Sequence, residues 1–188
     1  MDQILALALQ VREHYVRALL EAFEIFKAAH PQSATEVMFE IDRPEPLPHR
    51  LHRADMAADL DGKADVQEVN PATHLRFEPF EVDIDEGVTA GMPPIAWNDV
   101  GIRSNTKLPL EELEDWALSW LDLEDRHPAD EHGLRGVIHA VSREDAPDGS
   151  TLLEIDFGSS PVQALSELLE LAFASGASHI SIHSLTLE

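Results

Sequence analysis

Two segments near the C-terminus carry residue types that could do acid–base or metal chemistry. In residues 150–157 and 179–187, strand alternation turns the apolar side chains to one face of a sheet and the polar ones to the other. Two carboxylates, a hydroxyl and two imidazoles then share the polar face, and these types suit metal ligation or general acid–base catalysis. The five residues are Glu154, Asp156, His179, Ser181 and His183.

Strand geometry limits what this polar face can do. His179 and His183 are four residues apart, or about 13 Å along a strand, so they cannot ligate one ion together. Glu154 and Asp156 lie about 6.6 Å apart and could share an ion only through favourable rotamers. His139 is expected to face the same way, but on the opposite edge strand, roughly 14 Å from the last strand. The plainer interpretation is a polar sheet face that is wet or covered by the N-terminal helix. We therefore name no catalytic residue, metal ligand or cofactor.

A second cluster, His49, His52 and Asp55, lies in the segment HRLHRAD. Its spacing could chelate a divalent ion if the segment coiled into a turn, but the neighbouring Arg50 and Arg53 would repel a cation. We interpret the segment as a flexible, locally basic loop that in the plainest case is only solvated, and that otherwise pairs with the acidic body or contacts an anionic ligand.

The charge of the chain is large and uneven. The 188 residues contain 36 acidic and 13 basic side chains, a formal net charge of −23. Residues 1–53 carry a net −2 and residues 54–188 a net −21, with no Lys or Arg after Arg143. This balance argues against binding nucleic acid or an anionic membrane, which requires clustered cations. It fits either a highly solvated surface, as in a salt-tolerant organism, or a surface that captures a basic partner.

Two acidic segments are the candidate partner-binding residues. One is the outer face of the expected strand 80–85, and the other is the first turns of the expected helix that starts at Pro109. The residues are Glu81, Asp83, Asp85, Glu111, Glu112, Glu114 and Asp115. Our first hypothesis is a non-catalytic, immunity-type or inhibitor-type protein that binds a basic protein. The alternative is an enzyme or a small-ligand or metal-binding protein that uses the polar sheet face.

Several classes are excluded by what the sequence lacks. Without cysteine there are no disulfides, thiolate metal sites or cysteine nucleophiles. Phosphate-binding loops, nucleophile elbows and zinc-binding motifs are missing. No apolar run approaches the length of a membrane span, and acidic Asp2 stands where a signal peptide would be basic. We expect a bacterial-type cytoplasmic protein, and a homodimer through an exposed sheet edge is compatible with the sequence.

The elements that would position these residues indicate one α+β domain. Residues 94–188 read strand-helix-strand-strand-helix-strand, the βαββαβ pattern of ferredoxin-like folds, with two helices on one face of a four-stranded antiparallel sheet. Residues 1–90 form an N-terminal subregion that begins with an amphipathic helix over 3–29. We expect this subregion to pack on the other face or to extend the sheet.

Element boundaries follow from punctuating residues. Residues 35–42, 66–69 and 75–85 read as strands, the last with a slip at Pro79, whereas alternating prolines leave 43–65 the least structured part. Later strands are expected over 94–104, 133–142, 150–157 and 179–187. A capping box at Ser160 would open the second C-terminal helix. The three tryptophans are expected in the core; they are Trp97, Trp116 and Trp120.

Overall fold

A computed structural model describes residues 1–46, 48–60, 63–85 and 87–186 as an α+β structure with two sheets. Its elements in chain order are α1 (Asp2–Ala29), β1 (Ala34–Glu40), β2 (Leu51–Leu60), β3 (Lys63–Gln67), β4 (Phe80–Asp85), β5 (Val88–Met92), β6 (Val100–Ser104), α2 (Leu110–Leu121), β7 (Ala140–Asp145), β8 (Thr151–Asp156), α3 (Val162–Ala174) and β9 (His179–Ser184).

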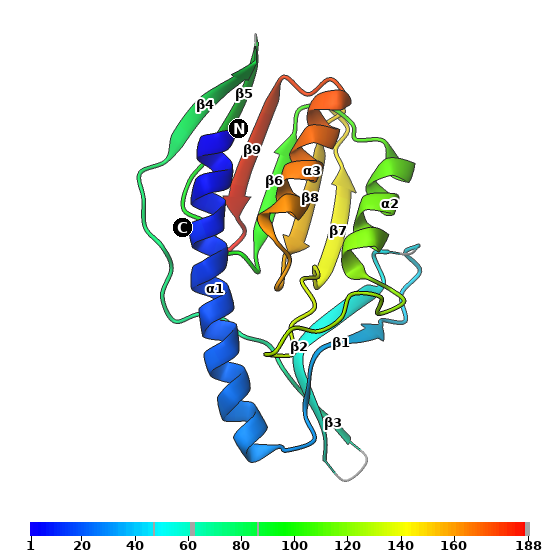
Figure 1. Cartoon of the computed structure of the whole chain (residues 1–188). Helices are drawn as coiled ribbons and strands as arrows, with labels where there is room; N and C mark the ends of the chain where they lie inside the picture. The colour runs from blue at the N-terminus through cyan, green and yellow to red at the C-terminus, as the bar shows by residue number, and fades with distance from the viewer. Residues whose placement is uncertain (47, 61–62, 86, 187–188) are drawn as a thin grey trace.

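The larger sheet has six strands in the order β4-β5-β9-β6-β8-β7 (Figure 1). Its neighbours are antiparallel except for β5 and β9, which run parallel. The sheet is therefore wider than the four strands expected and is mixed rather than antiparallel, because β4 and β5 extend it beyond β9. A separate antiparallel sheet has the order β1-β2-β3.

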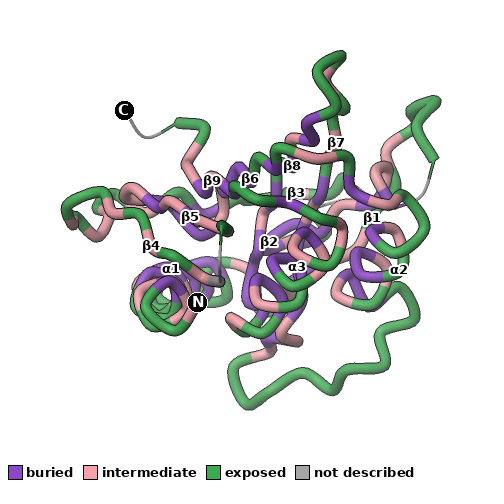
Figure 2. The backbone as a smooth tube through the Cα atoms, turned by 90° about the horizontal axis from the view of Figure 1, so that it is seen from above, coloured by how far each residue is buried: buried purple, intermediate pink, exposed green. Residues whose placement is uncertain are grey.

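All three helices lie on one face of the six-stranded sheet. Seen along the sheet, α1, α3 and α2 lie side by side beneath it (Figure 2), and α3 contacts both of the others. We expected the N-terminal subregion to pack on the opposite face or to extend the sheet; β4 and β5 do extend it, whereas α1 does neither, and for the helix the prediction is wrong. The strands explain the layering, because the side chains of Ile102, Leu153, Ile155 and Ile182 are all buried against the helices. The polar residues that alternate with them are left on an open face.

Helix α1 follows its hydrophobic period. Its buried residues recur every three or four positions, and they are Ile4, Ala8, Val11, Tyr15, Leu19, Phe23 and Phe26. The buried stripe is narrower than the sequence suggested, since Leu9 remains 45% exposed. The helix therefore covers the sheet with one face only and presents the other to water.

The segment 43–65, expected to be the least structured, contains β2 and the start of β3. The alternating prolines end at Pro48, three residues before β2 begins. Polar residues in β2 hid the strand from a pattern of apolar alternation. Its pairing with both β1 and β3 makes it the central strand of the smaller sheet.

Other boundaries also moved. Strands β4, β6 and β7 begin only at Phe80, Val100 and Ala140, and the residues before each of them form turns or coil. The register of β4 shifts between Asp83 and Asp85 and not at Pro79. The predicted capping box is absent, because Ser160 Oγ donates to the carbonyl of Phe157 at 2.6 Å and α3 starts without a side-chain cap.

Arg53 fastens the smaller sheet to the rest of the molecule. Its backbone N–H donates to the carbonyl of His139 at 2.8 Å. Its buried guanidinium donates to the carbonyls of Leu121, Asp122 and Glu36 at 2.9, 2.8 and 2.7 Å. Two of these carbonyls end α2, where a cation is favourable because of the helix dipole. Arg53 is thus a structural residue and not part of a flexible basic loop.

Two of the three tryptophans, Trp97 and Trp116, are buried as predicted, and Trp120 is half-buried against the same core. Within the described residues, no helix is long and apolar enough to cross a lipid bilayer.

Arg53→Met is expected to lower the free energy of unfolding by about 3–5 kcal/mol, because it leaves buried acceptors without their donor. Arg50→Met is the matched control, since Arg50 pairs at 2.8 Å with Glu40 in partly exposed surroundings; a loss below about 1 kcal/mol is expected there. Urea denaturation of both variants measures the difference, and equal losses would contradict the role given to Arg53.

Candidate functional site

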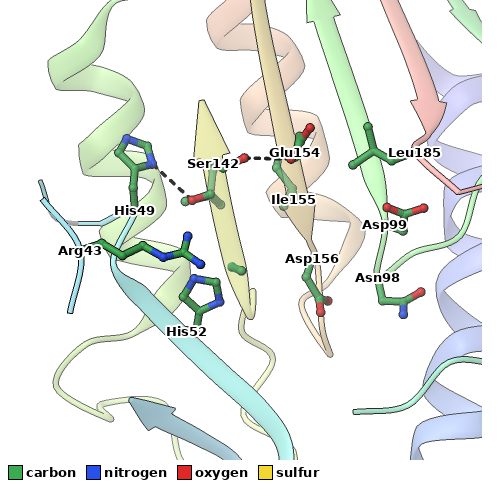
Figure 3. A pocket seen from close by; sticks show the side chains of 12 residues that line it. Arg43, His49, His52, Asn98, Asp99, Ser142, Glu154, Ile155, Asp156 and Leu185 are labelled. Carbon is green, nitrogen blue, oxygen red and sulfur yellow. Dashed lines mark hydrogen bonds between the residues drawn. The ribbon is translucent and has the colours of Figure 1, made fainter. Parts of the chain in front are cut away.

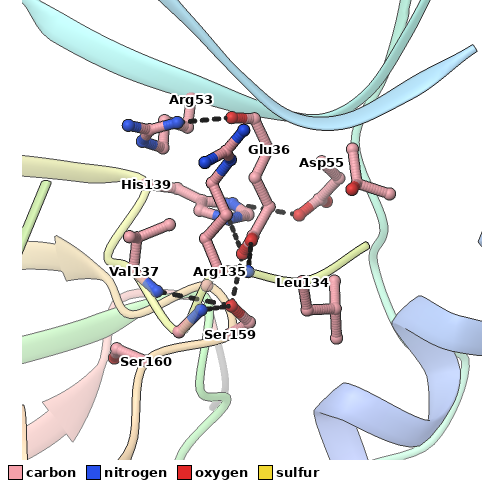
Figure 4. A network of polar contacts seen from close by, with 12 residues as sticks. Glu36, Arg53, Asp55, Leu134, Arg135, Val137, His139, Ser159 and Ser160 are labelled. Atoms are coloured by element: carbon pink, nitrogen blue, oxygen red, sulfur yellow. Dashed lines mark hydrogen bonds and ion pairs between the residues drawn. The ribbon is translucent and has the colours of Figure 1, made fainter. Parts of the chain in front are cut away.

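A fully buried histidine lies between two buried carboxylates where the two sheets meet (Figure 4). His139 Nε2 is 3.1 Å from Glu36 Oε1, and His139 Nδ1 is 3.0 Å from Asp55 Oδ1. The side chains of His139, Glu36 and Asp55 are 1%, 0% and 2% exposed. We call these three residues the buried triad.

The strand register places both carboxylates of the buried triad side by side. Thr35 pairs with Met56 and Val37 pairs with Ala54, so Glu36 and Asp55 lie opposite each other on β1 and β2. Two like charges in that position repel. Glu36 also has a φ of 51°, a left-handed conformation that costs a residue with a Cβ about 1–2 kcal/mol. The imidazole between the carboxylates offsets both costs.

The charge state of the triad follows from its geometry. Each ring nitrogen of His139 faces a carboxylate oxygen, and a carboxylate can only accept, so both nitrogens carry protons. The contact to Asp55 is not directed as a hydrogen bond and acts as an ion pair. Burial alone would lower the pKa of His139, but Asp55 and Glu36 raise it well above its ordinary value. Burial would raise the pKa of Asp55, but His139, the Val69 N–H and the Tyr15 hydroxyl lower it.

The loop between β8 and α3 is tied to the triad. Ser159 Oγ donates to Glu36 Oε1, and the Arg135 N–H donates to Glu36 Oε2. From α1, Arg12 donates to the carbonyls of Ser159 and Ser160 at 2.7 and 2.6 Å. The smaller sheet, α1 and the β8–α3 loop therefore all converge on one cluster.

Gly158 leaves room for the histidine. A Cβ at this position would lie 2.2 Å from His139 Cδ2, and the φ of Gly158 is +49°. Any side chain here would both strain the backbone and displace the ring of His139.

Asp156 connects the buried triad to the surface. Its Oδ2 is 4.0 Å from His139 Nδ1, its side chain is 24% exposed, and its Oδ1 accepts from the Gly158 N–H at 2.8 Å. Burial is the main cause that raises the pKa of Asp156 to about 7, and the charges of Asp55 and Asp99 add to it, although His139 opposes them. A carboxylic acid with such a pKa exists in both protonation states near neutrality.

Asp156 lines a pocket of about 260 Å³ on the open face of the larger sheet (Figure 3). The floor comes from β7 and β8, and one wall comes from the segment that precedes and begins β2. The charged and imidazole side chains that line the pocket are Arg43, His49, His52, Asp99, Glu154 and Asp156.

The two histidines of the pocket are held in different ways. His49 Nδ1 donates to the Val141 carbonyl at 3.2 Å, and this leaves Nε2 for a ligand. His52 stacks on Phe39 at 5.9 Å between ring centroids. Burial, and then the charge of Arg43, lower the pKa of His52, so it is mostly neutral at neutral pH.

The polar face predicted from the sequence exists, but only part of it reaches the pocket. Glu154 and Asp156 line the pocket, and Glu154 accepts from Ser142 Oγ at 3.2 Å. Gly101 pairs with Glu154 on one side and with His183 on the other, and the ring of His183 covers Gly101.

The other two residues of that face lie farther along β9. His179 Nδ1 is 2.8 Å from the Thr89 hydroxyl, and Ser181 pairs with Arg103 and Gly91. His139 does not share this face as expected, because it shares the orientation of buried Val141.

The acidic partner-binding candidates fall into two separate places. Glu81 and Asp83 are exposed on β4, at one edge of the sheet, and Asp85 ends β4 with its side chain outside the described part. Helix α2 lies over the opposite side of the sheet (Figure 1). There Glu111, Glu112 and Asp115 are exposed and Glu114 is half-buried. The structure does not bring the two groups onto one surface.

No metal centre is formed by the residues that the structure describes, as no group of three or more histidine, aspartate or glutamate side chains is arranged to hold an ion. In the cluster HRLHRAD, Asp55 turns into the buried triad whereas His49 and His52 face the pocket.

Comparison with protein-family models, with curated proteins and with solved structures gave no match.

Sequence reasoning missed the partners in the buried triad. Glu36 and His139 are 103 residues apart, and Tyr15 and Asp55 are 40 residues apart. The signals available were a histidine within the apolar run GVIHAV and an aspartate between Ala54 and Met56. Each marked a buried polar group without naming its partner.

Gly158→Ala is expected to cost more than about 2 kcal/mol, through backbone strain and displacement of His139. Gly101→Ala is the control: its Cβ would meet His183 at 2.4 Å, but that ring is half-buried on the open face and can rotate. In the His139→Ala background, the cost of Gly158→Ala should shrink, leaving the strain alone. A double-mutant cycle by urea denaturation measures this, and purely additive costs would contradict the packing described.

Asp156→Asn is expected to become more stabilising as pH rises. The unfolded chain ionises Asp156 near its ordinary pKa of 3.8, whereas the folded chain does so at about 7. Wild type therefore loses stability between about pH 4 and pH 7, by at most about 4 kcal/mol at 1.36 kcal/mol per pKa unit, and asparagine does not.

Denaturation of both proteins from pH 3 to pH 8 measures this trend, with Asp115→Asn on exposed α2 as control. Because His139, Asp55 and Asp99 remain in both proteins, their contributions largely cancel in the difference. A stability difference that stays flat with pH would contradict the raised pKa.

Proposed function

We propose that this protein binds a small polar molecule in the pocket above β7 and β8, and that Asp156 exchanges a proton with it. The position of Asp156 carries this proposal. Its carboxyl lines the pocket on one side and faces the charged, buried His139 on the other. Perturbed carboxylates in concave sites are more often functional than carboxylates on open surfaces.

The chemistry available is general acid–base catalysis or protonation-dependent binding. With a pKa of about 7, Asp156 can donate a proton in one step and accept it in the next. The buried triad fixes the charge behind Asp156, since Tyr15 and Val69 hold Asp55 at 2.9 and 2.6 Å. His49 Nε2 offers a second proton acceptor across the pocket.

A basic protein partner is the second candidate function, and one observation favours it. Glu111, Glu112 and Asp115 are exposed together on α2. A patch of like charge speeds the encounter with a basic protein. We rank it second because the acidic residues of β4 lie at the far edge of the sheet and cannot join the same contact.

We also propose that residues 94–188 form a ferredoxin-like unit. The order β9-β6-β8-β7, with each neighbouring pair antiparallel and with α2 and α3 on one face, supports this. In such a unit the open face of the sheet is available for ligands, and the pocket occupies one end of it.

Ligand binding is tested with ¹⁵N-labelled protein and mixtures of small polar metabolites at neutral pH. Compounds that bind should shift the amide signals of Ala140, Ser142 and Gly158. Asp156→Asn should weaken binding by about tenfold, or 1.4 kcal/mol, because it removes the titratable group. Glu170→Gln, on the exposed surface of α3, is the control. If no compound shifts these amides, the proposal is wrong.

A further inference from the structure

The pocket is divided into a basic and an acidic wall. Arg43, His49 and His52 lie on one side of β7, and Glu154 and Asp156 lie on the other, on β8 (Figure 3). A ligand with a single charge would satisfy one wall and leave the other facing it without a partner.

The basic wall has donors to spare. The guanidinium of Arg43 makes no hydrogen bond or ion pair with any described residue, although its charge lowers the pKa of the nearby His52. A guanidinium presents five N–H donors in a fork that matches carboxylate or phosphate oxygens. His49, held by the Val141 carbonyl through Nδ1, lies beside it, and its Nε2 donates to an oxyanion only when the ring is an imidazolium. This wall suits an oxyanion.

The acidic wall has acceptors to spare. Glu154 Oε2 accepts from Ser142 at 3.2 Å, and within the described residues Oε1 accepts nothing. Asp156 Oδ2 faces His139 only at 4.0 Å, beyond hydrogen-bond distance. Asp99, by contrast, has its Oδ2 engaged by Thr186 and Ser184 and contributes only charge. This wall suits an ammonium or guanidinium group.

Between the walls lies β7, which lines the small pocket with Ala140 and Ser142. Leu185, which is 45% exposed, lines it on the far side of Glu154 (Figure 3). A volume of about 260 Å³ is below the range of about 300–1,000 Å³ typical of drug-sized ligands. The space therefore fits a molecule of about the size of an amino acid.

We infer that the ligand is a small zwitterion of the amino-acid type, and this rests on the proposed function. Its carboxylate or phosphate group binds Arg43, its ammonium group binds Glu154 and Asp156, and a short apolar chain covers Ala140. Both charges are then paired in a partly dehydrated site, where each pairing is stronger than in water.

The inference is tested by calorimetric titration with ω-amino acids from 3-aminopropanoate to 6-aminohexanoate, compared with pentanoate and pentylamine at equal ionic strength. At least one ω-amino acid should bind about tenfold more tightly than either singly charged compound. Arg43→Gln and Glu154→Gln should each reduce that ligand to the affinity of a singly charged one. Both residues are exposed, and thermal melting confirms that the variants are folded.

A second readout follows the proton. An ammonium beside Asp156 favours its ionised form, so binding at pH 7 should release protons in wild type and fewer in Asp156→Asn. Titrations in buffers of different ionisation enthalpy count these protons. Equal release in both proteins would place the ammonium elsewhere and overturn the inference.

The outcomes separate the two proposals. If pentylamine or pentanoate binds as tightly as every ω-amino acid, one wall does not contribute to binding, and the inference that the ligand is a zwitterion is wrong. If no ω-amino acid binds at about 10 mM while a metabolite still shifts the pocket amides, the zwitterion is wrong and the binding pocket stands. If nothing shifts those amides, both proposals fail.

Discussion

The ion pairs of His139 with Glu36 and Asp55 are the interaction on which the rest of the structure depends. Each of these groups alone would be costly at its depth, since an unpaired buried charge costs several kcal/mol. Together they neutralise one another across 3.1 and 3.0 Å. Because Glu36 and Asp55 come from β1 and β2 and His139 precedes β7, these contacts dock the smaller sheet against the larger one in a single register.

The same cluster sets the properties of the pocket. Two carboxylates and one imidazolium leave a net negative charge behind Asp156, which is itself partly buried. Burial of Asp156 against this cluster is the main cause that raises its pKa to about 7, and the charge of Asp55 adds to the rise although the charge of His139 opposes it. The proton affinity of a surface-accessible group is thus a consequence of how the core is held together.

Sequence patterns predicted correctly the elements whose structure depends on residues close together in the chain. The apolar stripe of α1 and the alternation of buried and exposed residues in β8 and β9 could be recognised in the sequence, because burial there follows a short period. Strand β2 was missed because its partners, and not its own apolar content, stabilise it. The polar face of β8 and β9 was predicted, and the structure places Glu154 and Asp156 of that face in the pocket. The other wall of the pocket comes from a segment about a hundred residues earlier in the chain. Spacing along one strand carries no information about such contacts.

The uneven charge of the chain has a spatial counterpart in the pocket. Residues 1–53 are nearly balanced, at a net −2, whereas residues 54–188 carry −21. Folding the end of the first segment over β7 brings Arg43, His49 and His52 across from the acidic residues of the second. The uneven charge suggests an external basic partner, but at the pocket the basic residues that face the acidic ones come from the same chain. What remains unpaired is a gap with one cationic and one anionic side, so the complement that this gap favours is a small molecule carrying both charges.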